Sequence, residues 1–118
     1  MDKLFFKPDN AWVGDLIPYY EDGTYYAYYL HDPRVNPGEF AEETTWHLAT
    51  TKDCRKFQYQ GEAITRGGDD SPNKNIYTGS VIKKGENEYY AFYTAFNADI
   101  QIHGKSVQSV MSAFSTDL

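Results

Sequence analysis

The stretch that decides the fold is residues 11–30, AWVGDLIPYYEDGTYYAYYL. In it, the apolar run Leu16–Tyr20 is separated by Asp22-Gly23 from the aromatic run Tyr25–Leu30. An Asp-Gly pair between two apolar runs predicts two antiparallel strands joined by a tight turn. The first run is almost wholly apolar, so we expect its strand to be buried on both faces. Asp15 then stands at the start of this strand, where a strand end meets a pocket.

Two further strands are expected before a polar boundary. Residues 44–51 alternate, which places Trp46 and Leu48 on one face of a strand. Residues 57–60 alternate like an outer strand with one wet face. The long polar stretch at residues 67–75 is the natural boundary between two units. Because no segment shows sustained helical periodicity, the sequence predicts an all-β fold.

An internal repeat with a spacing of 64 residues supports this division. In the aromatic strand, Tyr25, Tyr26, Ala27 and Tyr29 recur as Tyr89, Tyr90, Ala91 and Tyr93. Further along, Ala49 recurs as Ala113, Thr51 as Ser115 and Asp53 as Asp117. Before the aromatic strand, Ile17 recurs as Val81. Each unit has the order strand, turn, strand, long loop, strand, turn, strand. Four antiparallel strands per repeat is the pattern of a β-propeller blade.

The length of the chain limits how much of a propeller it can form. Its 118 residues hold one blade, at about 11–66, and about three-quarters of a second, at about 75–118. Propellers close with roughly four to eight blades, so we predict a propeller fragment. A self-contained seven-strand sandwich is the alternative. The last strand of the second unit would present unpaired backbone groups, which predicts self-association through this exposed edge strand.

Composition and charge restrict the partners. The formal net charge is −6, and an acidic chain is a poor partner for nucleic acids or anionic membranes, which bind basic surfaces. A neutral ligand such as a sugar suits it. The single Cys54 cannot form an internal disulfide. The first residues lack an apolar signal segment, which favours the cytoplasm, or secretion if a signal was removed.

Several short motifs, in order, resemble those of glycoside hydrolase family 32, the β-fructosidases. The segment at 12–18, WVGDLIP, resembles W-M-N-D-P-N-G, and 25–33, YYAYYLHDP, is similar to Y-H-L-F-Y-Q-x-N-P. Residues 46–53, WHLATTKD, resemble W-G-H-A-V-S-T-D. Residues 77–80, YTGS, resemble W/F-S-G-S, and 115–118, STDL, repeat the S-T-D-L turn. The order of these motifs is more specific than any one of them.

The resemblance implies a five-bladed propeller with an axial funnel, and a retaining hydrolase of fructosyl bonds in sucrose, levan or inulin. It implies that Asp15 is the nucleophile. The family's other two acidic residues lie in R-D-P and E-C motifs, and neither motif is present here; Asp32-Pro33-Arg34 aligns with N-P instead. Retaining glycosidases need two carboxyl groups about 5 Å apart, so we expect this chain alone to be inactive.

The remaining candidates each have a structural alternative. The substrate-binding candidates are Trp46, Tyr77, Thr78, Gly79, His31 and Asp32. Trp46 either stacks on a sugar ring or fills the core between blades. Gly79 either lines the pocket or allows close backbone approach. A solvated turn is the alternative for His31 and Asp32. Against the resemblance, Gly14 stands for Asn and Leu30 for Gln.

Two other functions stay open at this stage. One is an inverting arabinan or xylan hydrolase of a related five-bladed family, in which Asp15 would be the general base. The other is a non-catalytic carbohydrate-binding module. We expect no metal and no cofactor, because His31, His47 and His103 show no ligand spacing. Asp69-Asp70 also lacks the oxygen pattern of a calcium site.

Overall fold

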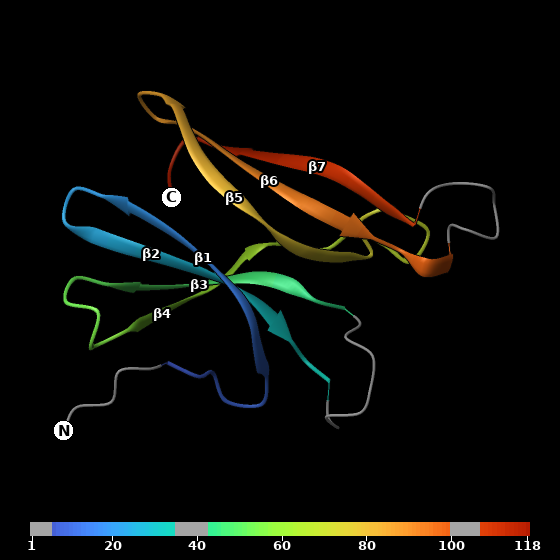
Figure 1. The fold of residues 1–118 in the computed structure, drawn as a ribbon, viewed down its shortest axis with the longest axis horizontal. Coiled ribbons are helices and arrows are strands. Elements are labelled where there is room, and N and C mark those ends of the chain that lie inside the picture. The colour runs from blue at the N-terminus through green and yellow to red at the C-terminus, as the bar shows by residue number, and fades with distance from the viewer. Residues whose placement is uncertain (1–5, 35–42, 100–106) are drawn as a thin grey trace.

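In the computed structural model, which describes residues 6–34, 43–99 and 107–118, the chain forms two antiparallel sheets (Figure 1). The first, sheet 1, has the order β1-β2-β3-β4, and the second, sheet 2, has the order β5-β6-β7. The strands are β1 (Trp12–Glu21), β2 (Thr24–Asp32), β3 (Thr45–Thr51), β4 (Gln58–Ile64), β5 (Asn75–Gly85), β6 (Glu88–Phe96) and β7 (Gln108–Ser115). The described residues contain no helix that is long and apolar enough to span a membrane.

The predicted hairpin is present. Glu21 pairs with Thr24, and the two residues between them, Asp22 and Gly23, have φ of 50° and 82°. Positive φ at both central residues is the geometry that the right-handed twist of a hairpin favours. Asp and Gly adopt it at low cost, which is why this pair stands at the turn.

The expectation that the first strand is buried on both faces is wrong. Ile17 is 3% exposed, but its neighbour Leu16 is 60% exposed and Tyr20 is 57% exposed. The reason is that β1 is an edge strand and only one of its faces is covered by sheet 2. From the apolar run alone, an edge strand covered on one face cannot be told from a strand covered on both faces.

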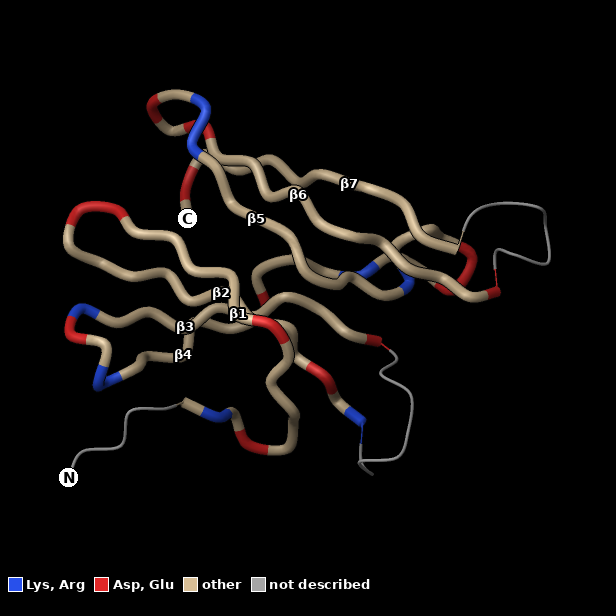
Figure 2. The backbone as a smooth tube through the Cα atoms, in the orientation of Figure 1, with Lys and Arg blue, Asp and Glu red and all other residues tan. Residues whose placement is uncertain are grey.

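The core lies between the facing surfaces of the two sheets, which we call the inner faces. Its buried members are Ile17, Tyr28, Leu30, Trp46 and Leu48 from sheet 1, and Ile76, Tyr93 and Ala95 from sheet 2. The first strands of the two sheets, β1 and β5, lie against each other where the sheets meet, and the sheets diverge from there (Figure 1). Charged residues gather in the turns and at the sheet ends, while the strand centres are almost free of charge (Figure 2).

The 64-residue repeat is visible in the hydrogen bonding. Tyr25 pairs with Thr51 in sheet 1, and Tyr89 pairs with Ser115 in sheet 2. The turn after each third strand is also the same. Thr51 Oγ1 donates to Asp53 Oδ1 at 3.2 Å, and Ser115 Oγ donates to Asp117 Oδ1 at 3.0 Å. Both aspartates are therefore turn residues.

One equivalence in the repeat is wrong. Val81 pairs with Ala91, whereas in sheet 1 the residue that pairs with the matching Ala27 is Pro18, not Ile17. The cause is an irregularity in β5 between Lys83 and Gly85, which offsets the rest of the strand by one residue. A one-residue offset moves every side chain to the other face of a strand.

Candidate functional site

Asp15 lies on a β-bulge. The pairing of β1 with β2 slips between Val13 and Leu16, so that Gly14 and Asp15 together stand opposite Leu30. A Cβ on Gly14 would lie 2.8 Å from the Leu30 Cβ, so glycine is required for this approach. Bulges redirect side chains at the edges of sheets, and the Asp15 carboxylate is exposed on the strand that adjoins β5.

A second bulge, in β5, holds three of the other candidates. The pairing of β5 with β6 slips between Ile76 and Gly79, which sets Tyr77 and Thr78 in the irregular segment. Thr78 is exposed. A Cβ on Gly79 would lie 1.8 Å from the Phe92 carbonyl oxygen, so Gly79 serves close backbone approach. Exposed Asp15 and exposed Thr78 thus lie on bulges of two neighbouring strands.

Trp46 fills the core between the sheets. Its side chain has no exposed surface, and its ring centroid lies 5.9 Å from that of Tyr28 and 6.1 Å from that of Tyr93. Its Nε1 donates a 2.7 Å hydrogen bond to the Tyr77 carbonyl oxygen, which ties sheet 1 to sheet 2. The sequence left two roles open for Trp46, and the structure shows the packing role. The backbone carbonyl of Tyr77 accepts the hydrogen bond of the buried indole.

His31 and Asp32 point to opposite faces of β2 and both have partners. The His31 ring stacks on His47 at 3.7 Å, and His47 Nδ1 lies 2.7 Å from the Tyr59 hydroxyl. Burial holds the pKa of His31 and of His47 below the ordinary value. Asp32 is buried rather than solvated; it accepts hydrogen bonds from Arg34 Nε at 2.6 Å and from Arg34 N at 3.0 Å. These contacts orient the strand end beside Asp15.

Trp12, at the start of β1, is not among the predicted site residues. Trp12 is 42% exposed, and the Arg34 guanidinium lies over its ring at 5.9 Å from the centroid. It pairs with Asp32 across the hairpin, so Trp12, Asp32 and Arg34 form one cluster at the end of β1 that carries Asp15. In the sequence, the available indication was a tryptophan three residues before an acid.

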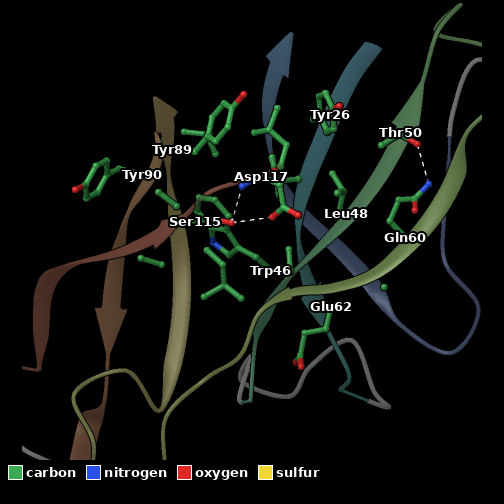
Figure 3. Close-up of a pocket in the computed structure, with 18 of the residues that line it drawn as sticks. Tyr26, Trp46, Leu48, Thr50, Gln60, Glu62, Tyr89, Tyr90, Ser115 and Asp117 are labelled. Atoms are coloured by element: carbon green, nitrogen blue, oxygen red, sulfur yellow. Dashed lines mark hydrogen bonds between the residues drawn. The ribbon is translucent and has the colours of Figure 1, made fainter. Parts of the chain in front are cut away.

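A cleft between the two sheets lies away from Asp15. It has a volume of about 690 Å³ between the inner faces, toward the end of the sheets where the β1–β2 turn lies. Tyr26, Leu48, Glu62, Tyr89, Ser115 and Asp117 are among the residues around it (Figure 3), and Asp15 is not. No group of three or more potential metal ligands occurs among the described residues. Because Asp15 is not among the residues that line the cleft, the cleft and the exposed Asp15 carboxylate are separate features.

The sequence model of the "Glycosyl hydrolases family 32 N-terminal domain" matches residues 5–118. The chain belongs to glycosyl hydrolase family 32. An invertase of Wickerhamomyces anomalus is 28% identical over 83 residues, which is 68% of this chain and 14% of the invertase. This family 32 chain thus spans about a seventh of the length of that relative.

Solved structures share the fold. A β-fructofuranosidase from Schwanniomyces occidentalis, complexed with fructosyl-erythritol, matches with a TM-score of 0.76 at 20% identity over 99% of this chain and 24% of the enzyme. Zg3597, a family 117 glycoside hydrolase from Zobellia galactanivorans, matches with a TM-score of 0.73 at 20% identity over 100% of this chain and 41% of that chain. The two sheets are therefore the N-terminal part of a family 32 propeller, as the sequence predicted.

Proposed function

We propose that this chain is the nucleophile-bearing N-terminal part of a retaining glycosidase that hydrolyses O-glycosyl bonds of fructose-containing saccharides. The observation that carries the proposal is the exposed carboxylate of Asp15 on the β1 bulge, in a chain of family 32. The relatives support the substrate class, because one is an invertase and another is a β-fructofuranosidase complexed with a fructoside. Sucrose, levan and inulin are the candidate substrates.

In this mechanism the Asp15 carboxylate attacks the anomeric carbon of the fructosyl unit and forms a covalent glycosyl-enzyme, while a second carboxyl group protonates the leaving oxygen. Water then hydrolyses the intermediate with the second group acting as base. Asp32, the acid at the neighbouring strand end, is occupied by Arg34. We infer that the second carboxyl group comes from outside these 118 residues.

The nucleophile can be identified by trapping. The protein encoded by the complete reading frame is incubated with sucrose, denatured rapidly with acid and digested, and its peptides are weighed by mass spectrometry. The peptide that contains Asp15 is expected to carry one fructosyl unit, and Asp15→Asn is expected to lose both this adduct and fructose release. Full activity of Asp15→Asn would contradict the proposal.

The 118-residue chain itself supplies a second test. We expect no fructose release from sucrose or levan above a blank, because one carboxylate cannot act as both nucleophile and acid. Fructose release that Asp15→Ala abolishes would show that the chain holds both groups.

For the complete protein, NMR of the first-formed product is expected to show a retained anomer. An inverted anomer would make Asp15 a general base instead, and binding without turnover would indicate a carbohydrate-binding module.

A further inference from the structure

The cross-strand row of sheet 1 to which Asp15 belongs is otherwise apolar. Gly14 and Asp15 of β1 stand opposite Leu30 of β2. Leu30 in turn pairs with Trp46 of β3, and Trp46 pairs with Ile64 of β4. Apart from the Asp15 carboxylate, the one polar side-chain atom of this row is Trp46 Nε1, which already donates to a backbone carbonyl of sheet 2. Within this row, hydrogen bonding to a ligand therefore falls to Asp15 alone.

Leu30 lies on the same face of sheet 1 as the acid. It is 8% exposed and packs with Ile17 and Trp46 in the core. Asp15 precedes Ile17 by two residues, and alternate residues of a strand share a face, so both side chains project toward sheet 2. Opposite residues of an antiparallel pair have Cβ atoms about 4.5–5.5 Å apart. A sugar held at the Asp15 carboxylate thus has an aliphatic side chain beneath it on β2.

The glycine beside Asp15 belongs to the same arrangement. The described glycines with positive φ are Gly23 and Gly61, so the backbone conformation at Gly14 does not require a glycine. The space does, because a Cβ there would lie 2.8 Å from the Leu30 Cβ and 3.2 Å from its Cδ1. The motifs that this chain resembles have an amide at each position, Asn for Gly14 and Gln for Leu30. Since the two positions compete for one space, these two departures are a single coupled change.

We propose that Gly14 and Leu30 are a specificity-determining pair, which makes the sugar subsite at Asp15 indifferent to one hydroxyl group of the fructosyl unit. The substrate class then extends to deoxy-fructosides that lack this hydroxyl. The proposal rests on the proposed function, because it takes Asp15 as the group at which the fructosyl unit sits. A site that hydrogen-bonds a hydroxyl rejects the analogue without it, because polar groups of the site are left unpaired. An aliphatic surface has no such group to leave unpaired.

The neighbouring polar side chains of β2 do not replace the two amides. His31, the next residue after Leu30, lies on the opposite face of the strand, where its ring stacks on His47 at 3.7 Å. Asp32 is buried and accepts hydrogen bonds from Arg34 Nε at 2.6 Å and Arg34 N at 3.0 Å. The loss of hydrogen bonding beside Asp15 is therefore not made up by the end of β2.

Binding of deoxy analogues gives the first test. The protein encoded by the complete reading frame, with Asp15→Asn to prevent turnover, is titrated calorimetrically with sucrose and with its four analogues that each lack one fructosyl hydroxyl. At least one analogue is expected to bind within about threefold of sucrose. A larger loss for all four analogues, with sucrose bound, would overturn this inference and leave the proposed function intact. A folded protein that does not bind sucrose would instead count against the substrate class of the proposed function, and this inference would fall with it.

A polar residue at position 30 gives the second test. In the active protein, Leu30→Gln is expected to raise the ratio of kcat/KM for sucrose to kcat/KM for the tolerated analogue by about tenfold. The ratio is compared between proteins because the intrinsic reactivity of each sugar is the same for all of them. Leu30→Met, which keeps an apolar side chain of similar volume, is the matched control and is expected to leave the ratio unchanged.

Circular dichroism checks the fold of each variant, and Leu30→Thr, which is smaller and carries a hydroxyl, takes the place of Leu30→Gln if glutamine prevents folding. A folded polar variant with an unchanged ratio would overturn the proposal. So would an equal rise of the ratio in Leu30→Met, because the effect would then come from disturbed packing rather than from a new hydrogen bond.

Discussion

Replacing Trp46 by alanine is expected to remove the side chain that joins the two sheets. The residue is fully buried between Tyr28 and Tyr93, so the truncation leaves a cavity lined from both sides. Large-to-small substitutions of buried tryptophan cost about 3–5 kcal/mol. Domains of ordinary stability unfold with about 5–15 kcal/mol, so Trp46→Ala is expected to remove a large share of the free energy of unfolding.

Trp46→Phe separates the hydrogen bond from the packing. The phenyl ring keeps most of the apolar contact but leaves the Tyr77 carbonyl oxygen without its 2.7 Å donor. This hydrogen bond is part-buried, and the net contribution of one such bond is about 0.5–1.5 kcal/mol. We therefore expect Trp46→Phe to lie between the unmodified chain and Trp46→Ala in stability.

The assay is urea unfolding followed by far-ultraviolet circular dichroism, with the midpoint and slope fitted for each variant. The matched control is Trp12→Ala, because Trp12 is half-exposed and its ring makes a cation–π contact with Arg34, worth about 0.5–1 kcal/mol. If Trp46→Ala cost no more than Trp12→Ala, the assignment of Trp46 to the core would be refuted.

Three further perturbations test other parts of the fold. Gly79→Ala is expected to break the pairing of β5 and β6, because its Cβ would lie 1.8 Å from the Phe92 carbonyl oxygen; loss of amide protection in hydrogen exchange would show it. Lowering the pH from about 7 to about 5 is expected to destabilise the chain, since burial holds the pKa of His31 and of His47 below the value of about 6.5 that the unfolded chain has. This stability is present above about pH 6.5 and is lost below it, and the decline of the urea midpoint is expected to be smaller when both histidines are replaced by glutamine. Glu21→Gln is expected to lower the thermal midpoint at neutral pH, because Lys83 and Tyr89 of sheet 2 donate hydrogen bonds to this carboxylate and hold its pKa below the usual value. This contribution is present above the usual pKa of about 4.3 and is lost as the pH falls through the lowered pKa, so the difference between the two proteins is expected to shrink progressively in acid.

The features that the sequence predicted correctly depend on local chemistry. Asp22 and Gly23 fix a turn through their own backbone preferences, and the tyrosines of β2 recur in β6 because both strands have the same place in their sheets. Asp15 was selected in the same way, from its neighbours in sequence; the structure places it exposed on a bulge, and its catalytic role stays a prediction. Such features need no knowledge of distant residues.

The features that the sequence missed depend on packing between segments that lie far apart. The one-residue offset that separates Ile17 from Val81 arises from an irregularity near Lys83, and alternation alone does not reveal such a slip. Whether Trp46 faces a sugar or a second sheet is decided by Tyr77, 31 residues later. Likewise, Leu16 belongs to an apolar run but remains 60% exposed, because it lies on an edge strand and on the face of sheet 1 that is turned away from sheet 2.

The chain has two indoles, and they occupy opposite environments, one shielded from water at the contact between the sheets and one half in solvent. In a Trp12→Phe background, all tryptophan emission would come from Trp46. Its wavelength would then report docking and separation of the sheets at a single position, in equilibrium or in a rapid-mixing experiment. The molecule therefore carries a built-in optical probe of whether its two halves are together.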